Sequence, residues 1–228
     1  MKNSHVVRLL ASVALVATPL TMQAQTSFVA SRASMSGSLL NWNTIYGPNG
    51  TSVGAGFTAT GLGGLTLSTT GPSSVQVLNQ GSGWSGGFLG GEPVLYSSGS
   101  PGALSLLFNA DIFGLGANLQ SNFFGSFTGT VKAYNAANAL LGSYDVNGVS
   151  NSNGDGSQPF LGIRNVAGMR RVTFEVSGSI QDFSLGLNLA TIETTSNTTV
   201  PEPSTYLLMA SGLAAIAAIR RRRHATSR

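Results

Sequence analysis

The sequence predicts an all-β protein, an antiparallel β-sandwich of the jelly-roll type, and three observations support this prediction. First, 30 glycines and 8 prolines in 228 residues favour many short strands and turns over long helices. Second, apolar and polar residues alternate in several segments, as they do in strands with one buried face. Third, stretches rich in glycine, serine and asparagine separate these segments and predict turns between them.

The clearest alternation lies in residues 171–177, where Val172, Phe174 and Val176 are expected to face the core. In residues 182–189, every second residue from Phe183 onward is apolar. The other expected strands are 64–69, 74–78, 93–97, 104–108, 128–134, 140–146 and 160–164. This number of strands predicts one sandwich domain over residues 25–193.

The net charge of +4 does not belong to the predicted domain. Most lysines and arginines lie near the two ends of the chain, and between Gln25 and Val200 five bases face seven acids. A slightly acidic body without a basic stripe lacks the charge pattern that binds a phosphate backbone. Nucleic acid is therefore not expected as a partner.

The first 24 residues have the layout of a secretory signal peptide. Lys2 and Arg8 precede an apolar run over residues 9–17, which is too short to span a bilayer and is predicted to be helical. Pro19 and a polar stretch then end the run. We expect signal peptidase to cut between Ala24 and Gln25; an uncleaved N-terminal anchor is the alternative.

The C-terminal end predicts a linker and a short membrane helix. Residues 194–203 are rich in Thr, Ser and Pro, as in an extended linker. The apolar residues 206–219 give about 21 Å of helix, so the predicted transmembrane segment is 204–223 and its arginines mark the cytoplasmic side. Residues 224–228 form a tail. The arginines of this cluster are Arg220, Arg221, Arg222 and Arg223.

This arrangement resembles the PEP-CTERM sorting signal of Gram-negative bacteria, also catalogued as the ice-binding protein C-terminal domain. A Pro-Glu-Pro motif, a short transmembrane helix and an arginine cluster occur in the same order. The resemblance implies recognition by an exosortase, cleavage near the motif, and delivery to the envelope or extracellular polymer; a plain tail anchor is the alternative. The motif residues are Val200, Pro201, Glu202, Pro203 and Ser204.

The second half of the body also resembles a sandwich common in secreted PEP-CTERM proteins. The shared segments are 113–114, 129–134, 139–142, 160–163 and 171–174. That family usually ends with an Asp-Asn pair in its last strand, whereas this chain has Leu187, Asn188 and Leu189 there.

Two motifs for catalysis and cofactor binding occur in residues 81–87 and both lack their necessary context. Ser85 lies in a G-x-S-x-G motif, but the two histidines are His5 and His224, so the body offers no imidazole base. The G-x-G-x-x-G match in the same stretch is followed by Gly and Pro and cannot open a helix. Since the chain also has no cysteine, thiol nucleophiles, zinc sites and disulfides are not expected, nor is any cofactor.

Residues 151–156 alternate oxygen-bearing side chains with a final Gly, as in the first half of a calcium loop. The twelfth position is Gly162 where a calcium loop has an acid, so a solvated turn is favoured. If a cation binds, Asp145 and Asp155 are the expected carboxylates.

Two sets of side chains are candidates for binding or cleaving carbohydrate. Glu175 and Asp182 lie on or beside strands and are candidates for the paired carboxylates of a glycoside hydrolase. A sugar-stacking platform needs exposed aromatic rings. The candidates for it are Trp42, Tyr46, Trp84 and Tyr96.

The sequence thus predicts a secreted, non-enzymatic protein of the Gram-negative cell envelope or exopolysaccharide matrix, with a structural or adhesive role. Its expected partners are signal peptidase, exosortase, the membrane through the C-terminal helix, and exopolysaccharide. The alternatives are a carbohydrate-binding module for matrix polysaccharide and a glycoside hydrolase. An antifreeze role needs a flat, Thr-rich face and is not favoured.

Overall fold

The described domain is built from β-strands that pair antiparallel except for one short parallel pair over residues 79–84, which confirms the predicted all-β class. The computed structural model describes residues 26–54, 57–62, 64–71, 74–98, 102–178, 185–196 and 211–214. The strands are β1 (Thr26–Val29), β2 (Ser38–Leu40), β3 (Ser52–Val53), β4 (Phe57–Leu62), β5 (Leu65–Thr70), β6 (Val75–Gln80), β7 (Gly83–Trp84), β8 (Pro93–Ser97), β9 (Leu104–Ser121), β10 (Gly125–Tyr134), β11 (Leu140–Ser150), β12 (Phe160–Ser177), β13 (Leu185–Leu187) and β14 (Ala190–Glu193).

The alternation expected for residues 171–177 is present in β12. Val172 and Phe174 are fully buried and Val176 is 1% exposed. In the neighbouring β10, Phe127, Val131 and Ala133 are buried in the same way. These residues join one large apolar cluster that includes side chains from β5, β6, β8 and β13. Burial of this continuous apolar surface is the main favourable term that holds the strands together.

Several strands are longer than the sequence predicts. The expected strand 104–108 extends to Ser121 as β9, and the expected strands 160–164 and 171–177 are the two ends of β12. Between these ends the register with β9 shifts twice, around Met169. Gly168 has a φ of 87° there, which favours glycine, and such a bulge bends a strand without ending it.

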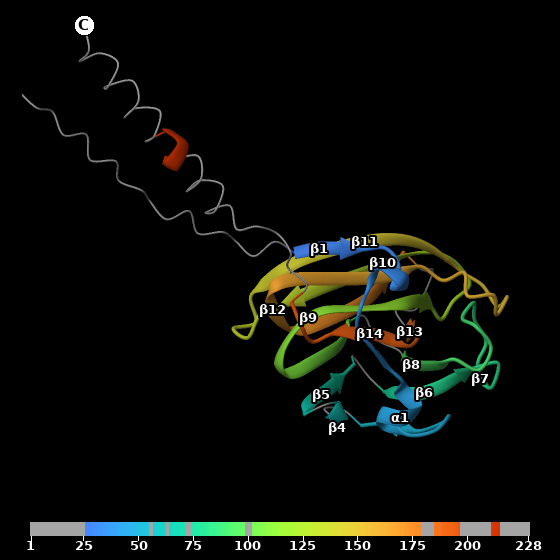
Figure 1. Ribbon diagram of the computed structural model, residues 1–228. Helices are drawn as coiled ribbons and strands as arrows, with labels where there is room; N and C mark the ends of the chain where they lie inside the picture. Colours follow the sequence, from blue (N-terminus) through green and yellow to red (C-terminus); the bar gives the residue numbers. More distant parts are fainter. Residues whose placement is uncertain are drawn as a thin grey trace, which may run out of the picture.

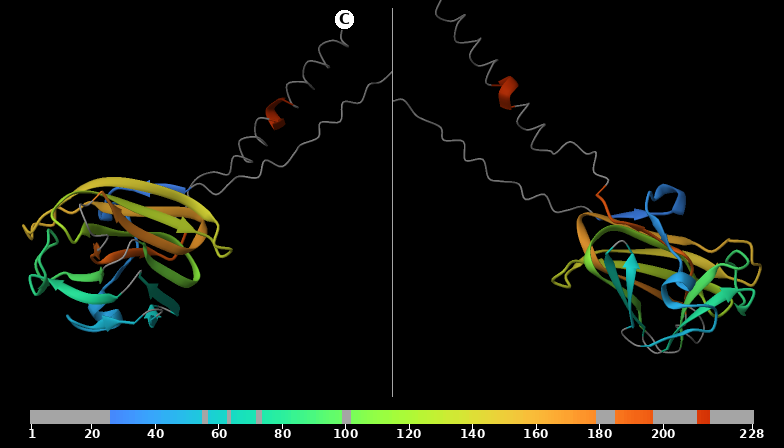
Figure 2. Two further views of the ribbon diagram at one scale, coloured as in Figure 1. Left: turned by 180° about the vertical axis from the view of Figure 1, so that it is seen from behind. Right: turned by 60° about the horizontal axis from the view of Figure 1, so that its bottom comes forward.

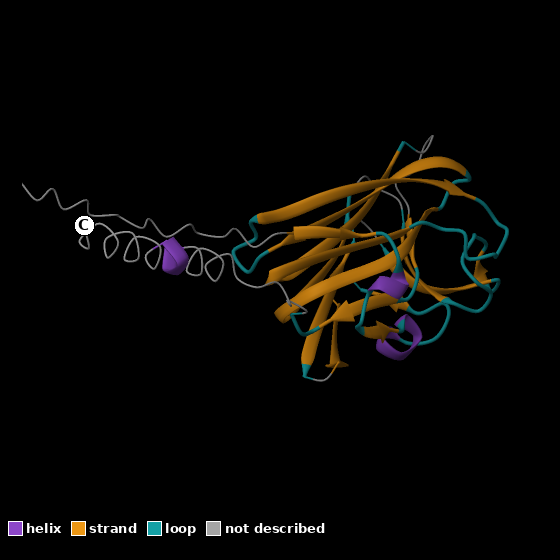
Figure 3. Ribbon diagram, turned by 45° about the horizontal axis from the view of Figure 1, so that its top comes forward, coloured by secondary structure: helices purple, strands orange, loops and turns teal. Residues whose placement is uncertain are grey.

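The long strand β9 connects two layers of sheet (Figure 1). Figure 3 shows how strands make up most of the described domain. The first residues of β9 pair with β5 and β12, its middle pairs with β12 and β14, and its last residues pair with β13. Figure 1 shows β10, β11 and β12 on one side of the molecule and β6 and β8 on the other. The strand order is β11-β10-β12-β9-β13-β8-β6-β3. This order leaves the jelly roll, the finer part of the fold prediction, unconfirmed.

One short helix lies beside this core. Asn41 caps helix α1 (Trp42–Tyr46), because its side-chain oxygen accepts hydrogen bonds from the backbone N–H groups of Asn43 and Thr44. Trp42 is fully buried and stacks on Tyr46. A 3-10 turn, η1 (Arg32–Ser34), lies between β1 and β2. In the chain, the turn with Arg32 precedes β2 and the helix with Trp42 follows it.

Most of the predicted sorting elements lie outside the described residues. These are the signal peptide with its Ala24–Gln25 cleavage site, the motif 200–204 and the arginine cluster 220–223. Of the predicted transmembrane segment 204–223, residues 211–214 are described and are helical. Across the described ranges, no helix combines the length and apolarity that a membrane crossing requires. The transmembrane helix therefore stays a prediction.

Candidate functional site

Two loops meet at one end of the β-domain (Figure 2). The loop between β7 and β8 and the loop between β11 and β12 are joined by backbone hydrogen bonds from Gly154 to Gly86 (3.0 Å) and from Gly156 to Gly87 (2.8 Å). The buried side chain of Gln80 also bonds both the N–H and the C=O of Gly86. These contacts make the two loops one structural unit.

Gly86 and Gly87, which follow Ser85 in the G-x-S-x-G stretch, form this loop contact. A Cβ atom at Gly86 would lie 2.1 Å from Nε1 of Trp84, and one at Gly87 would lie 2.0 Å from Nε2 of Gln158. Both positions therefore need glycine for close packing. Ser85 is exposed, and the part of the chain that the structure describes contains no histidine to activate it.

The predicted stacking platform is wrong for the tryptophans. Trp42 is fully buried and Trp84 is 5% exposed, packed against Phe88 and Tyr96. Tyr46 is also buried, and Tyr96 is half-buried against the Trp84 cluster. Because a sugar must reach the face of a ring to stack on it, the two tryptophans and Tyr46 act in core packing.

The carboxylates proposed for calcium make separate local contacts. Asp145 on β11 accepts a hydrogen bond from Thr130 on β10, and Asp155 accepts one from the backbone N–H of Ser157. Within the described ranges, no three His, Cys, Asp or Glu side chains gather closely enough to hold a metal ion. Of the proposed glycosidase pair, Glu175 lies 3.4 Å from Lys132 in an ion pair, and Asp182 lies outside the described residues.

The structure instead brings together four polar side chains that the sequence did not group. A cavity of about 210 Å³ lies beside the two joined loops. Arg32 Nη2 donates hydrogen bonds to Asn118 Oδ1 (2.9 Å), Asn188 Oδ1 (2.7 Å) and the carbonyl of Leu189 (2.7 Å). Asn188 Nδ2 donates to Glu92 Oε2 at 2.5 Å. The cavity is lined by Arg32, Phe88, Leu89, Glu92, Asn118, Gly156 and Asn188, and we call it the Arg32–Glu92 pocket.

The opposite charges of Arg32 and Glu92 in the Arg32–Glu92 pocket do not contact each other directly. Within the described residues, Arg32 and Glu92 form no direct ion pair, whereas Arg164, Arg170 and Lys132 each pair with a carboxylate. Burial lowers the pKa of the Arg32 guanidinium, and the negative charge of Glu92 partly offsets this effect. The 98% buried Asn188 amide stands between the two charges and bonds both. The Arg32 charge is stabilised instead by its hydrogen bonds and by the ring of Phe160, whose centroid lies 5.9 Å from the guanidinium carbon. Partly desolvated charges in a cleft are candidates for binding sites.

Sequence reasoning missed this pocket because its members are far apart in the chain. Arg32 and Asn188 are separated by 156 positions. Arg32 and Glu92 were counted only as scattered charges, and Asn188 only as a difference from the Asp-Asn pair. No local pattern in a single sequence signals such a long-range cluster.

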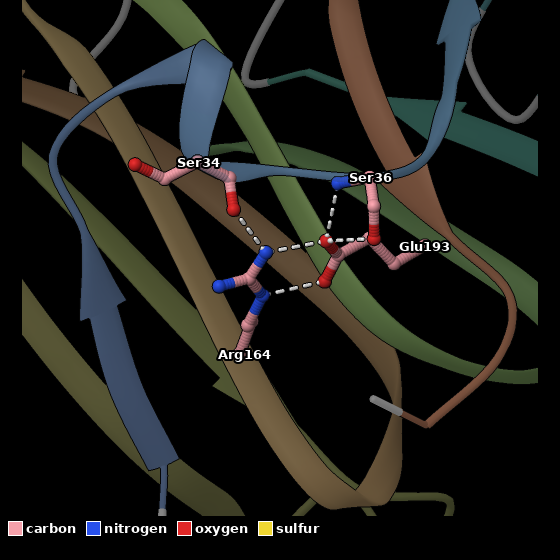
Figure 4. A network of polar contacts seen from close by, with 4 residues as sticks. All are labelled: Ser34, Ser36, Arg164 and Glu193. Carbon is pink, nitrogen blue, oxygen red and sulfur yellow. Dashed lines mark hydrogen bonds and ion pairs between the residues drawn. The ribbon is translucent and has the colours of Figure 1, made fainter. Parts of the chain in front are cut away.

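A second polar network fixes the last strand of the domain (Figure 4). Glu193 ends β14 with only 3% exposure and receives hydrogen bonds from Arg164 Nε (2.6 Å) and Nη2 (2.5 Å). The backbone N–H of Ser36 donates to the same carboxylate at 2.9 Å, and Arg164 also donates to the carbonyl of Ser34. The network therefore joins β12, β14 and the segment before β2, immediately ahead of the predicted linker 194–203.

Folding stability is expected to fall in acid through Glu193. Burial raises the pKa of this carboxyl, but the bonds from Arg164 and Ser36 lower it more, so the pKa lies below its ordinary 4.5. The resulting stability is complete above pH 4.5 and disappears as the pH falls through the lowered pKa. Urea unfolding at about pH 7 and about pH 3 measures it. We expect Glu193→Gln to lose less stability on acidification than the wild type, and equal losses would contradict this assignment.

Comparison with known proteins identifies the C-terminal segment. Residues 199–223 match the family model of the PEP-CTERM protein-sorting motif. No curated protein matches the chain significantly. A crystal structure of a DUF4465 family protein from Bacteroides caccae ATCC 43185 is similar over 73% of this chain and 99% of that one, with 11% sequence identity and a TM-score of 0.37. A similarity this weak carries no argument about the domain. The chain thus has a PEP-CTERM protein-sorting motif at residues 199–223, the mark of a secreted protein targeted by an exosortase.

Proposed function

We propose that this chain is a non-enzymatic surface protein with a structural or adhesive role in the envelope or exopolysaccharide matrix of a Gram-negative bacterium. The sorting motif at residues 199–223 is the observation that carries the proposal. According to this proposal, an exosortase removes the C-terminal segment, and the β-domain is delivered to the envelope or to the outside of the cell. The non-enzymatic part rests on the sequence between Gln25 and Val200, which has no His or Cys.

The structure of β14 supports a role in which the domain is held by its C-terminal end. All four residues of β14 are buried, and the strand pairs with β2 on one side and β9 on the other. The Glu193–Arg164 ion pair lies at the end of this strand, just before the linker. A force that pulls on residues 194–203 would therefore act on an interior strand, which is hydrogen-bonded to a strand on each side and fixed by a buried ion pair. A surface protein that is attached through its C-terminal end requires such resistance to force.

Replacing Pro201, Glu202 and Pro203 by Ala is expected to abolish processing and retain the chain in the inner membrane. Fractionation of native cells into inner membrane, outer envelope and medium, with immunoblotting of each, measures the distribution. The control replaces Thr194, Thr195 and Thr198 by Ala, which changes the linker and leaves the matched motif 199–223 intact. If the motif variant reaches the envelope and the medium as the wild type does, sorting does not depend on the motif and the proposal fails.

A further inference from the structure

The Arg32–Glu92 pocket has hydrogen-bonding capacity that the protein itself does not use. Both amide groups accept one hydrogen bond and donate one, because Asn188 bonds Arg32 and Glu92 while Asn118 bonds Arg32 and the carbonyl of Gln158. Arg32 bonds through Nη2, and no group in the described residues accepts from its Nε or Nη1. Glu92 Oε2 accepts from Asn188 and from the backbone N–H of Leu89, which leaves Oε1 without a donor among the described residues.

Arg32 and Glu92, which both line the cavity, therefore keep cationic N–H donors and a carboxylate oxygen for a ligand, and a buried amide joins the two side chains. Asn188 holds the two side chains at the right places before a ligand arrives, which lowers the entropy cost of binding. The free groups are complementary to a pair of hydroxyls, since each hydroxyl both donates and accepts a hydrogen bond. Hydrogen bonds to charged partners are stronger than those between neutral groups.

The size and apolar lining of the pocket suit a single sugar ring. Its 210 Å³ correspond to about seven water molecules at bulk density. The side chains of Phe88 and Leu89 supply apolar contact; Phe88 is buried, while Leu89 is 52% exposed. A pyranose presents C–H surface as well as hydroxyls, so it matches both parts of the lining.

We propose that the Arg32–Glu92 pocket binds one hexose-sized unit of a neutral polysaccharide, in a donor and acceptor clamp made by Arg32 and Glu92. This inference rests on the proposed function and names the chemistry that would hold the domain to a matrix. The ligand is neutral because the opposite charges of the pocket balance. A free amino acid fits less well, because its ammonium group has three donors and the pocket leaves one carboxylate oxygen to accept them.

The test measures binding by the mature protein, purified from its native envelope. The probes are the host's own exopolysaccharide and the methyl glycosides of glucose, galactose and mannose, with alanine as the zwitterionic comparison. Isothermal titration calorimetry gives the affinity. Tryptophan fluorescence gives a second readout, because the Trp84 ring lies 6.2 Å from that of Phe88 in the pocket wall.

We expect binding of the polysaccharide and at least one glycoside, and a loss of about tenfold or more in affinity in Glu92→Gln and Arg32→Gln. Glu92→Gln retains the size of the side chain and one acceptor oxygen, so it tests the pocket even if Arg32→Gln unfolds. Arg170→Gln is the matched control, since Arg170 pairs with Asp111 away from the pocket, and its affinity should equal that of the wild type.

The possible outcomes distinguish a failure of the pocket proposal from a failure of the proposed function. Glycan binding that survives in Glu92→Gln and in a folded Arg32→Gln overturns the pocket, as does binding of alanine without any glycoside. A correctly sorted protein that binds none of the glycans also overturns this inference and leaves the surface role intact. Failure of sorting in the fractionation experiment overturns the proposed function, whatever the calorimetry gives.

Discussion

Replacement of Arg164 by Ala is expected to lower the free energy of unfolding by about 3–5 kcal/mol. The variant leaves the Glu193 carboxylate, which is 3% exposed, without its cation. The backbone N–H of Ser36 remains as a donor, but the bonds from Nε and Nη2 of Arg164 are lost. Equilibrium urea unfolding of the variant and the wild type at pH near 7 measures the difference.

Arg170→Ala is the control for this prediction. Arg170 also forms an ion pair, but with Asp111, whose side chain is 49% exposed. Exposed pairs contribute about 0–1 kcal/mol, so this variant should stay close to the wild type. If the two arginine variants lose the same stability, Glu193 does not depend on Arg164 as the structure indicates. The double variant Arg164→Met with Glu193→Gln should recover part of the loss, because no buried charge remains unpaired.

Replacement of Trp42 by Ala is expected to cost about 3–5 kcal/mol of folding stability. The side chain is fully buried in the large apolar cluster, and its Nε1 donates to the carbonyls of Leu187 (2.9 Å) and Asn188 (3.1 Å). The loss combines a large cavity with two carbonyl groups that lose a donor. Thermal or urea unfolding followed by far-UV circular dichroism measures it.

The two tryptophans provide a matched comparison. Trp42→Phe retains a ring and removes the N–H donor, which should cost about 1–3 kcal/mol from the unpaired carbonyls in addition to the packing change. In Trp84, Nε1 is buried and has no hydrogen-bond partner in the described residues, so Trp84→Phe removes no such bond. We therefore expect Trp42→Phe to be the more destabilising substitution, and the reverse order would contradict the assigned role of Nε1.

The strands that could be predicted are those whose signal is local. Alternation at Val172, Phe174 and Val176 placed one end of β12, and residues 93–97 coincide with β8. The sequence did not predict that β9 extends to Ser121 and joins two layers, because its pairing partners β5, β12, β13 and β14 are distant in the chain. The bulge near Gly168 also hid the continuity of β12, since a glycine inside a run normally indicates its end.

The functional sites also divide into those with a local sequence signal, which could be predicted, and those without one. The sorting motif is a contiguous pattern, so the sequence alone located it at the residues that the family model matches. The aromatic side chains could not be assigned correctly, because composition does not distinguish a buried ring from an exposed one. The Arg32–Glu92 pocket and the Glu193–Arg164 pair arise from contacts between residues that are 29 to 157 positions apart, and only the folded structure brings these residues together.

The intact mass of the protein recovered from native envelope and medium tests directly whether this chain is a processed surface protein. We expect a polypeptide that begins at Gln25 and ends near Pro203, and we expect the variant with Pro201, Glu202 and Pro203 replaced by Ala to retain its C-terminal segment through Arg228. A wild-type polypeptide that still ends at Arg228 would contradict exosortase processing and show instead a chain held by an intact C-terminal tail.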